Sequence, residues 1–313
     1  MRGWSDQKAD MKLSIVIPTR NRAVKLERTL RSLAVQTVPP NAYEVVVVDN
    51  GSSDGTAELL PRYGRNFPNW QGLREAQPGA AAARNRGVLA SRGEVVVFLD
   101  DDVIATSDLL QEHLNAQAAH RGSAVLGYVR NGWNETGSAF YWVLSHKELM
   151  HSFRFSDPSD VSFVHFYSCN VSIPRAALLR VGLFDEGFTG AAFEDIDLGY
   201  RLRRSGCRLI FNSNATVTHE PVLSLDGFRH KRFNAGSGLH RLITKHPELQ
   251  AMLVPSAPLR VLRSKLGRLT AVLGRTFERP VPLRRLLLPV LGQACWFHLE
   301  HHFWAGFNET ARL

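Results

Sequence analysis

Three consecutive aspartates, Asp100–Asp102, directly follow the apolar run 96–99. Neighbouring carboxylates repel one another, and a buried carboxylate without a partner costs several kcal/mol. Two carboxylates separated by one residue at the end of a strand can instead chelate Mg²⁺ or Mn²⁺, which prefer oxygen ligands. A lone Asp-x-Asp is more often a solvated acidic turn, but the strand before it and the motifs described below favour a cation site.

Two further segments carry groups that could take part in chemistry. The stretch 194–206, EDIDLGYRLRRSG, predicts a helix with an acidic first turn, a basic last turn and Gly206 as its end. This charge order suits the helix dipole, which by itself would explain the acids. The stretch 207–220 predicts a bent strand or strand pair ending at His219. An imidazole there is either structural or a third ligand acceptable to Mn²⁺.

The segments before these groups alternate between strand and helix patterns. Apolar runs at 12–19, 43–49 and 94–100 are typical of strands buried on both faces. Helices are predicted at 23–37, with Leu26, Leu30, Leu33 and Ala34 on one stripe and Asn21 as the cap, from Thr56 onward, and at 79–91. Such alternation predicts an α/β fold with a mostly parallel central sheet and helices on both faces. Because ligands bind outside the carboxyl ends of such strands, Asp49 and Asp100–Asp102 are expected to face one crevice.

The charge is distributed unevenly along the 313 residues. Residues 1–225 contain 24 Lys+Arg and 24 Asp+Glu, whereas residues 226–313 contain 14 and 5. We therefore expect a polar leader at 1–11, a neutral body at 12–225 and a basic, mainly helical extension at 226–313. The excess of positive charge predicts an anionic partner for the extension, either a membrane surface or nucleic acid.

Amphipathic and aromatic patterns in the extension favour the membrane surface. Leu262, Leu266, Leu269 and Leu273 form one stripe of a predicted helix. The apolar stretch 286–307 is interrupted by Glu300 and three histidines, so it predicts an interfacial segment rather than a span of ~20 apolar residues. Packing on the body is the alternative, and nucleic-acid binding is disfavoured because the apolar faces are too large.

The cysteine count and the N-terminus bear on location. Three widely separated cysteines predict neither a disulfide framework nor a zinc site, which fits a reducing compartment. The HLEHH stretch 298–302 lacks the order of a zinc-binding helix and is interpreted as a helix with polar faces. No secretory signal is recognisable, so a cytoplasmic location is expected, with a peripheral position at the inner face of the cell membrane.

Five motifs in a fixed order resemble the inverting family 2 glycosyltransferases of the GT-A fold. They are IVIPTRNR (15–22), VVVVDNGSSDGT (45–56), QPGAAAARNRG (77–87), FLDDDV (98–103) and FEDIDLGYRLRRSG (193–206). The resemblance covers about 12–225 and implies a nucleotide-diphosphate sugar donor of the UDP, dTDP or GDP type. A QxxRW motif is absent, which favours addition of a single sugar over polymer synthesis.

The resemblance assigns donor-binding residues one by one. It implies nucleotide-sugar contacts for Pro18, Thr19, Arg20, Arg22, Asp49, Gly51, Arg84, Asn85, Asp100 and Asp101. Structural alternatives remain open: a turn residue for Thr19, a cap of the following turn for Asp49, and an exposed helical side chain for Arg84.

The resemblance also implies a metal site and a general base. Mn²⁺ or Mg²⁺ would be held by Asp102, with Asp100 and His219 as further ligands. Asp195 matches the carboxylate that takes the proton of the acceptor hydroxyl, and Glu194 is the second candidate. Asp197 is expected to cap or position the helix.

The expected activity is transfer of one hexosyl or deoxyhexosyl group to a glycan or lipid-linked acceptor in cell-surface polysaccharide or glycolipid synthesis. One alternative is a nucleotidyltransferase, although no Gly-rich loop with a basic signature is present near the N-terminus. Another is a non-catalytic, membrane-associated module that binds nucleotide sugars or glycans, which the presence of Asp100, Asp102 and Asp195 disfavours.

Overall fold

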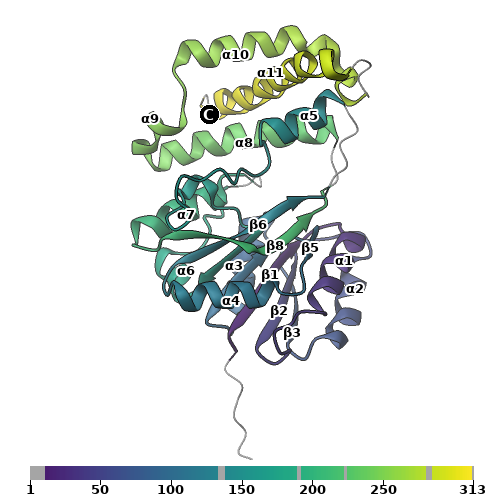
Figure 1. Cartoon of the computed structure of the whole chain (residues 1–313), viewed down its shortest axis with the longest axis vertical. Coiled ribbons are helices and arrows are strands. Elements are labelled where there is room, and N and C mark those ends of the chain that lie inside the picture. Colours follow the sequence, from purple (N-terminus) through teal and green to yellow (C-terminus); the bar gives the residue numbers. More distant parts are fainter. Residues whose placement is uncertain (1–10, 133–137, 189–191, 222–223, 280–283, 312–313) are drawn as a thin grey trace, which may run out of the picture. The chain divides into compact units, whose positions relative to one another are not determined.

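The computed structural model describes residues 11–132, 138–188, 192–221, 224–279 and 284–311. It divides into two compact units that are interleaved along the chain (Figure 1). The sheet unit comprises Met1–Asn131, Phe155–Glu186 and Leu198–Glu220. The helical unit comprises Gly132–Arg154, Gly187–Asp197 and Pro221–Leu313. The predicted boundary near residue 225 stays a prediction about domain organisation.

The sheet unit is built on one mixed sheet of eight strands in the order β3-β2-β1-β4-β7-β6-β8-β5. Strands β3, β2, β1 and β4 run parallel, as the alternating pattern of the first half predicts. Strand β7 is antiparallel to both β4 and β6, and β5 is antiparallel to β8. The strands are β1 (Leu13–Thr19), β2 (Tyr43–Asp49), β3 (Trp70–Arg74), β4 (Val95–Leu99), β5 (Val103–Ala105), β6 (Ala124–Asn131), β7 (Asn170–Pro174) and β8 (Leu209–His219).

Both faces of the central strands are covered. All seven residues of β2 are buried, and successive strand residues point to opposite faces, so neither face is open to water. The α/β prediction is confirmed. The helices of this unit are α1 (Ala23–Leu33), α2 (Thr56–Tyr63), α3 (Ala80–Ala90), α4 (Leu109–Ala119) and α6 (Arg175–Val181), with α7 (Glu194–Arg204) passing from the helical unit into it.

Helix α1 is shorter than its sequence pattern predicts. Leu26, Leu30 and Leu33 are buried as expected, but the helix ends at Leu33 and Ala34 is exposed beyond it. The predicted cap is also wrong. Asn21 has a left-handed φ of 53° and its side-chain oxygen accepts a hydrogen bond from the Ser53 amide, so it connects two loops instead of capping the helix.

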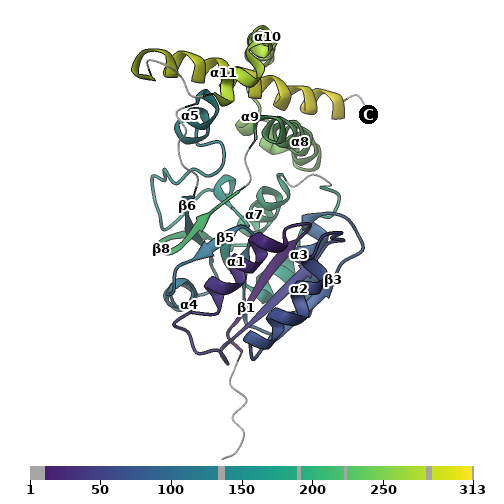
Figure 2. The same ribbon diagram turned by 90° about the vertical axis from the view of Figure 1, so that its right-hand side faces the viewer.

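The helical unit contains α5 (Ala139–His146), α8 (Leu225–Lys245), α9 (Gln250–Leu253), α10 (Ala257–Leu269) and α11 (Arg284–Thr310). Helix α11 packs between α8 and α10 (Figure 2). Close approach of α8 and α11 depends on Gly236 and Gly306. A Cβ on Gly236 would lie 1.8 Å from the Phe303 carbonyl oxygen, and one on Gly306 would lie 2.0 Å from that of Phe233.

The aromatic stretch 286–307, predicted as an interfacial segment, instead supplies buried side chains to the core of this unit. Cys295, Leu299 and Trp304 of α11 are almost completely buried against α5 and α8. Within the described residues, no helix has both the length and the apolar character needed to span a bilayer.

Candidate functional site

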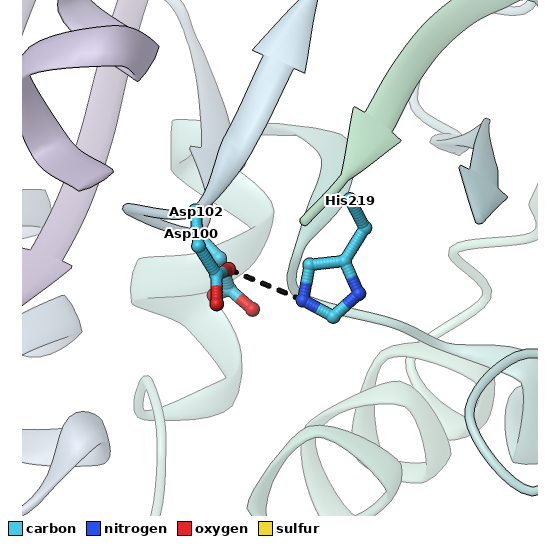
Figure 3. Close-up of side chains that lie close together, drawn as sticks. All are labelled: Asp100, Asp102 and His219. Atoms are coloured by element: carbon cyan, nitrogen blue, oxygen red, sulfur yellow. Dashed lines mark ion pairs between the residues drawn. The ribbon is translucent and has the colours of Figure 1, made fainter. Parts of the chain in front are cut away.

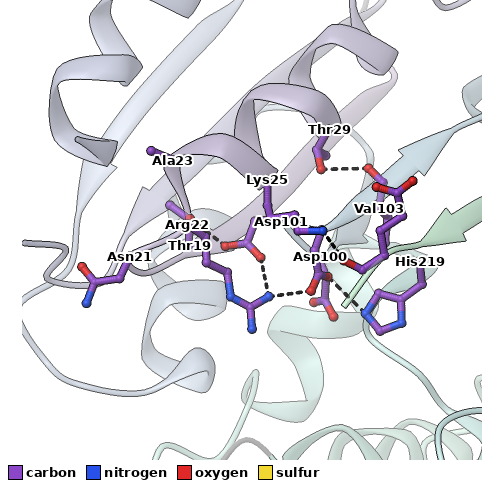
Figure 4. Close-up of polar contacts among 12 residues, drawn as sticks. Thr19, Asn21, Arg22, Ala23, Lys25, Thr29, Asp100, Asp101, Val103 and His219 are labelled. Carbon is purple, nitrogen blue, oxygen red and sulfur yellow. Dashed lines mark hydrogen bonds and ion pairs between the residues drawn. The ribbon is translucent and has the colours of Figure 1, made fainter. Parts of the chain in front are cut away.

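The loop after β4 places three carboxylates beside basic groups. Arg22 Nη1 lies 3.1 Å from Asp101 Oδ1 and 2.6 Å from Asp102 Oδ2, and the Thr19 hydroxyl donates to Asp101 over 2.7 Å (Figure 4). Asp101 and Asp102 are about 95% buried. Burial raises the pKa of Asp101 to about 6, against the lowering effect of Arg22 and Thr19. Burial by itself would lower the pKa of Arg22, but the negative charges of Asp100–Asp102 raise this pKa above its usual value.

Helix α3 supplies the counter-ion of the first aspartate. The buried Arg84 places Nη2 3.1 Å from Asp100 Oδ1. The predicted alternative of an exposed helical side chain is therefore wrong for Arg84. Its neighbour Asn85 lies elsewhere, since its amide donates to the Phe184 carbonyl and to Glu186. The structure thus brings Arg84, but not Asn85, to the aspartates.

Asp100, Asp102 and His219 form a cluster suited to a divalent cation (Figure 3). Their ligand atoms lie within 4.8 Å of one another, and His219 Nε2 is 3.1 Å from Asp102 Oδ1. Strand pairing explains the placement, because Val103, next to the aspartates, is paired with His219 at the end of β8. Two carboxylates and an imidazole fit Mn²⁺ and, less closely, Mg²⁺.

The carboxyl end of β2 lies beside a cavity of about 430 Å³. Asp49 lines it together with apolar and mixed side chains from α2 and β3, namely Ala57, Leu60, Pro61, Trp70, Leu73 and Arg74, and with Gly72. Asp49 is buried, and one of its oxygens accepts from the Ser52 amide over 2.9 Å. This contact is the turn cap that the sequence left open as an alternative, and the position at the cavity is compatible with binding as well.

The remaining predicted donor residues surround the first two loops of the sheet unit. Pro18 and Thr19 end β1, Arg20 is exposed in the following turn, and Gly51 has a left-handed φ of 76° after β2. Asp54 accepts from the amides of Ala23 and Thr56, so it has a turn and capping role.

The acids of α7 belong to the helical unit up to Asp197, whereas the aspartate loop and His219 belong to the sheet unit. Glu194 is buried, and Asp195 is partly exposed with Oδ1 accepting from the Ile196 amide. Asp197 is fully buried and pairs with Lys245 at 2.9 Å and His246 at 2.8 Å. The positioning role expected of Asp197 fits these contacts.

Two features of the site were not predicted from the sequence. Arg22 was expected to contact the donor, but its link to both Asp101 and Asp102 was not foreseen. Lys245 and His246 were missed as partners of Asp197. The available signal was that Lys245 ends a helix and His246 follows it directly, and this does not specify a partner almost fifty residues away.

Comparison with known proteins assigns the family. Residues 14–187 match the model of glycosyl transferase family 2. The chain belongs to this family. A similar protein, the validoxylamine A glucosyltransferase of Streptomyces hygroscopicus subsp. limoneus, is 34% identical over 275 residues, which are 76% of this chain and 57% of that protein. The chain thus spans about three-fifths of the curated relatives it matches first.

Two solved structures share the fold of this chain. The mannosyltransferase PcManGT of Pyrobaculum calidifontis, in complex with GDP-Man and Mn²⁺, superposes with a TM-score of 0.62 at 22% identity, over 99% of this chain and 90% of that one. S. aureus TarS 1-349 in complex with UDP-GlcNAc gives 0.54 at 18% identity, over 96% and 92%. These likenesses confirm the predicted GT-A fold.

Proposed function

We propose that the chain transfers a single sugar from a nucleotide-diphosphate sugar to an acceptor hydroxyl, with inversion at the anomeric carbon. The observation that carries the proposal is the cluster of Asp100, Asp102 and His219 at the carboxyl ends of the strands of a family 2 chain. Family membership argues against the nucleotidyltransferase alternative. The complete acidic set argues against a non-catalytic module.

The cavity beside Asp49 is the proposed site of the donor base. Its walls include the apolar side chains of Leu60 and Trp70, and Asp49 offers a buried hydrogen-bond acceptor. A largely apolar cavity with one placed polar group is typical of a nucleobase-sized ligand. The UDP-GlcNAc and GDP-Man bound by the two structural neighbours support a nucleotide-sugar donor and leave the base open.

The proposed metal is Mn²⁺ or Mg²⁺, held by Asp102 and Asp100 with His219. When bound, it would neutralise the negative charge that develops on the diphosphate leaving group. Arg22 is ion-paired with Asp102, and Arg84 is ion-paired with Asp100. They are proposed to orient the diphosphate, in agreement with their predicted donor contacts.

Asp195 is the proposed general base, and Glu194 is the second candidate. Inversion requires the hydroxyl to attack from the side opposite the diphosphate, so its proton must pass to a carboxylate on that side. Asp195 is only partly buried, so it is accessible to an acceptor, whereas Glu194 is buried. This difference in exposure favours Asp195.

The acceptor is proposed to be a glycan or a lipid-linked precursor of a cell-surface polysaccharide or glycolipid. A cytoplasmic location fits the three cysteines, which are buried and widely separated along the chain. The validoxylamine A glucosyltransferase relative supplies a contrasting acceptor for the test. Transfer to validoxylamine A, with none to glycan or polyol-phosphate acceptors, would overturn this part of the proposal.

Donor binding and turnover test the proposal together. Thermal shifts with UDP-glucose, UDP-GlcNAc, GDP-mannose and dTDP-glucose, each with Mn²⁺ or EDTA, should single out one base and require the metal. Release of nucleoside diphosphate from that donor, by transfer to acceptor or water, should stop on chelation and return with Mn²⁺ or Mg²⁺. Full activity in EDTA would contradict the metal role of Asp102.

Helix α10 is the proposed contact with an anionic membrane surface. Leu262 and Leu269 are 54% and 73% exposed on its outer face, and Lys265 and Arg268 are exposed beside them. The other half of the predicted stripe, Leu266 and Leu273, is partly buried. Apolar side chains flanked by cations are typical of helices that lie in the headgroup region of a bilayer.

Vesicle sedimentation tests this contact. The full chain should sediment with vesicles of phosphatidylglycerol and phosphatidylcholine, and much less with phosphatidylcholine alone. The double variant Leu262→Asp/Leu269→Asp should lose this binding. Val35→Asp, which changes a side chain of similar exposure (66%) in the sheet unit, should retain it. Equal loss in both variants, or binding to an RNA oligonucleotide in place of vesicles, would overturn the membrane assignment.

A further inference from the structure

One face of helix α8 contacts the segment that carries the acids of α7. Gly238, Arg241 and Lys245 follow one another at spacings of three and four residues, so they lie on one side of the helix. His246 is the next residue along the chain. Each of these residues contacts part of segment 187–197, and all of them belong to the helical unit.

The end of α8 neutralises the last acid of that segment. Lys245 Nζ lies 2.9 Å and His246 Nε2 lies 2.8 Å from Asp197 Oδ1, and Lys245 also donates to Asp197 Oδ2 over 3.1 Å. Asp197 is fully buried, and a buried carboxylate is stable only when it is paired. Its amide donates to the Phe193 carbonyl over 2.9 Å, so the ion pair is tied to the first turn of α7.

The middle of the α8 face approaches the residues just before α7. A Cβ on Gly238 would lie 2.6 Å from the Ala192 carbonyl oxygen and 3.3 Å from Phe193 Cβ. Phe193 has a φ of 71°, a left-handed conformation that is costly for a bulky residue and persists only where its surroundings hold it. Gly238 permits the close packing that can hold it.

Arg241 covers the other end of the segment. Its guanidinium lies 5.2 Å from the centre of the Phe188 ring. A Cβ on Gly187 would overlap Nη2 at 1.8 Å, so the guanidinium sits directly over the backbone of that glycine. The α8 face therefore contacts the segment at both ends and immediately before the acids.

We infer that α8 positions the carboxylates of Glu194 and Asp195 for reaction, with Gly238, Arg241, Lys245 and His246 as positioning residues. This inference rests on the proposed function, in which Asp195 is the base. The direction of its side chain is set by where the first turn of α7 begins, and that point is set by contacts with α8. A displacement of about 1 Å in a reacting group can cost ~10²-fold in rate.

Gly238→Ala tests the inference with one methyl group. With whichever of UDP-glucose, UDP-GlcNAc or GDP-mannose supports turnover, kcat should fall about 10- to 100-fold. The donor KM, and the calorimetric stoichiometry and Kd of the corresponding nucleoside diphosphate, should stay within about twofold. Gly227→Ala in the first turn of α8 is the matched control, because among the described residues its Cβ would meet Ser224 Oγ alone, at 3.0 Å. Its kcat should be unchanged.

A second pair of variants covers the case in which Gly238→Ala does not fold. His246→Ala should lower kcat per nucleotide-binding site about tenfold, and His246→Gln, which retains an N–H donor, should recover most of the loss. If both variants fold, an unchanged kcat per site in both Gly238→Ala and His246→Ala would overturn the inference. If Gly238→Ala does not fold, an unchanged kcat per site in His246→Ala would overturn it. Asp195→Asn, measured in parallel, distinguishes failure of the proposed function from failure of the inference about α8. If Asp195→Asn keeps full turnover, the proposed function fails. If Asp195→Asn is inactive while the α8 variants keep their turnover, only the positioning role of α8 fails.

Discussion

The aspartate loop after β4 and the first turn of α7 are acidic clusters that are stabilised in different ways. Asp100–Asp102 are paired with groups of the sheet unit. Their partners Arg22 and Arg84 lie in two of the motifs that are recognisable in the sequence. In the first turn of α7, Asp197 is paired with Lys245 and His246 from the end of a helix 48 residues further on. A cluster whose partners lie in recognisable motifs can be interpreted from sequence. The partners of a cluster that is held by a distant helix can be identified only from the structure.

The largest effect is expected from Asp102→Asn. Loss of the carboxylate between Arg22 and His219 should weaken Mn²⁺ binding and lower turnover by about 10⁴-fold, because several kcal/mol of leaving-group stabilisation depend on the metal. Mn²⁺ titration calorimetry and nucleoside diphosphate release measure the two losses. Asp157→Asn, in an exposed turn, is the control and should change neither. Retained Mn²⁺ affinity in Asp102→Asn would remove this residue from the metal site.

Asp195→Asn, in the first turn of α7, should impair turnover without affecting the metal site of the aspartate loop. Turnover should fall by about 10³-fold, within the range for loss of a general base, while Mn²⁺ affinity and donor KM stay unchanged. Steady-state kinetics with the preferred donor measure the split between kcat and KM. Glu194→Gln should have the smaller effect on kcat. The reverse order would make Glu194 the base.

The sheet unit should lose stability in acid through His113. This histidine is fully buried between Ser172 and Asn170, and burial lowers its pKa from 6.5 to about 4. Because the folded pKa lies below the unfolded one, the stabilisation is complete above pH 6.5 and is lost as the pH falls through about 4. Its size is about 3 kcal/mol at most.

Urea unfolding of the wild type and of His113→Gln between pH 7 and pH 4 measures this contribution. The variant should be less stable at pH 7, because its side chain matches the two partners less well. The difference between the free energies of unfolding of the two proteins should narrow as the pH falls. A gap that is constant with pH would mean that His113 does not titrate on unfolding.

The smallest effect is expected from Arg22→Met. Removal of a cation that lies on Asp101 and Asp102 should raise Mn²⁺ affinity about fivefold, a change of about 1 kcal/mol, and weaken donor binding. Mn²⁺ and nucleotide titrations report the two changes separately. Arg28→Met is closely matched, since its side chain is 49% exposed against 48% for Arg22 but pairs with Glu220. It should alter neither affinity.

The sequence predicts the first half of the fold well, for a physical reason. Strands β1, β2 and β4 are mostly apolar segments that lie directly before the proposed site residues, and the apolar stripe of α1 is buried as expected. Strand β8 is a single strand that ends at His219, as predicted, and its register against β6 shifts between Gly127 and Tyr128. These features are local, so periodicity and turn residues are sufficient to find them.

Other features depend on contacts that no local pattern encodes. The antiparallel insertion of β7 between β4 and β6 follows from tertiary packing. The residue type and position of Asn21 predict a helix cap, but its side-chain oxygen instead accepts a hydrogen bond from the Ser53 amide in a neighbouring loop. The partners of the basic residues of α8 are also distant: Arg229 donates to His302 and Arg232 pairs with Glu300, both on α11.

The interleaving of the two units has a consequence for dissecting the protein. The sequence changes composition near residue 225, where a chain would naturally be shortened to isolate the family 2 segment. Such a fragment would keep Asp197 and lose Lys245 and His246, leaving a buried carboxylate without these two partners. It would also lose Gly238 and Arg241 from around Phe193 and Phe188. The basic extension is therefore expected to behave as an inseparable part of the enzyme, and a fragment without it should bind donor more readily than it turns donor over.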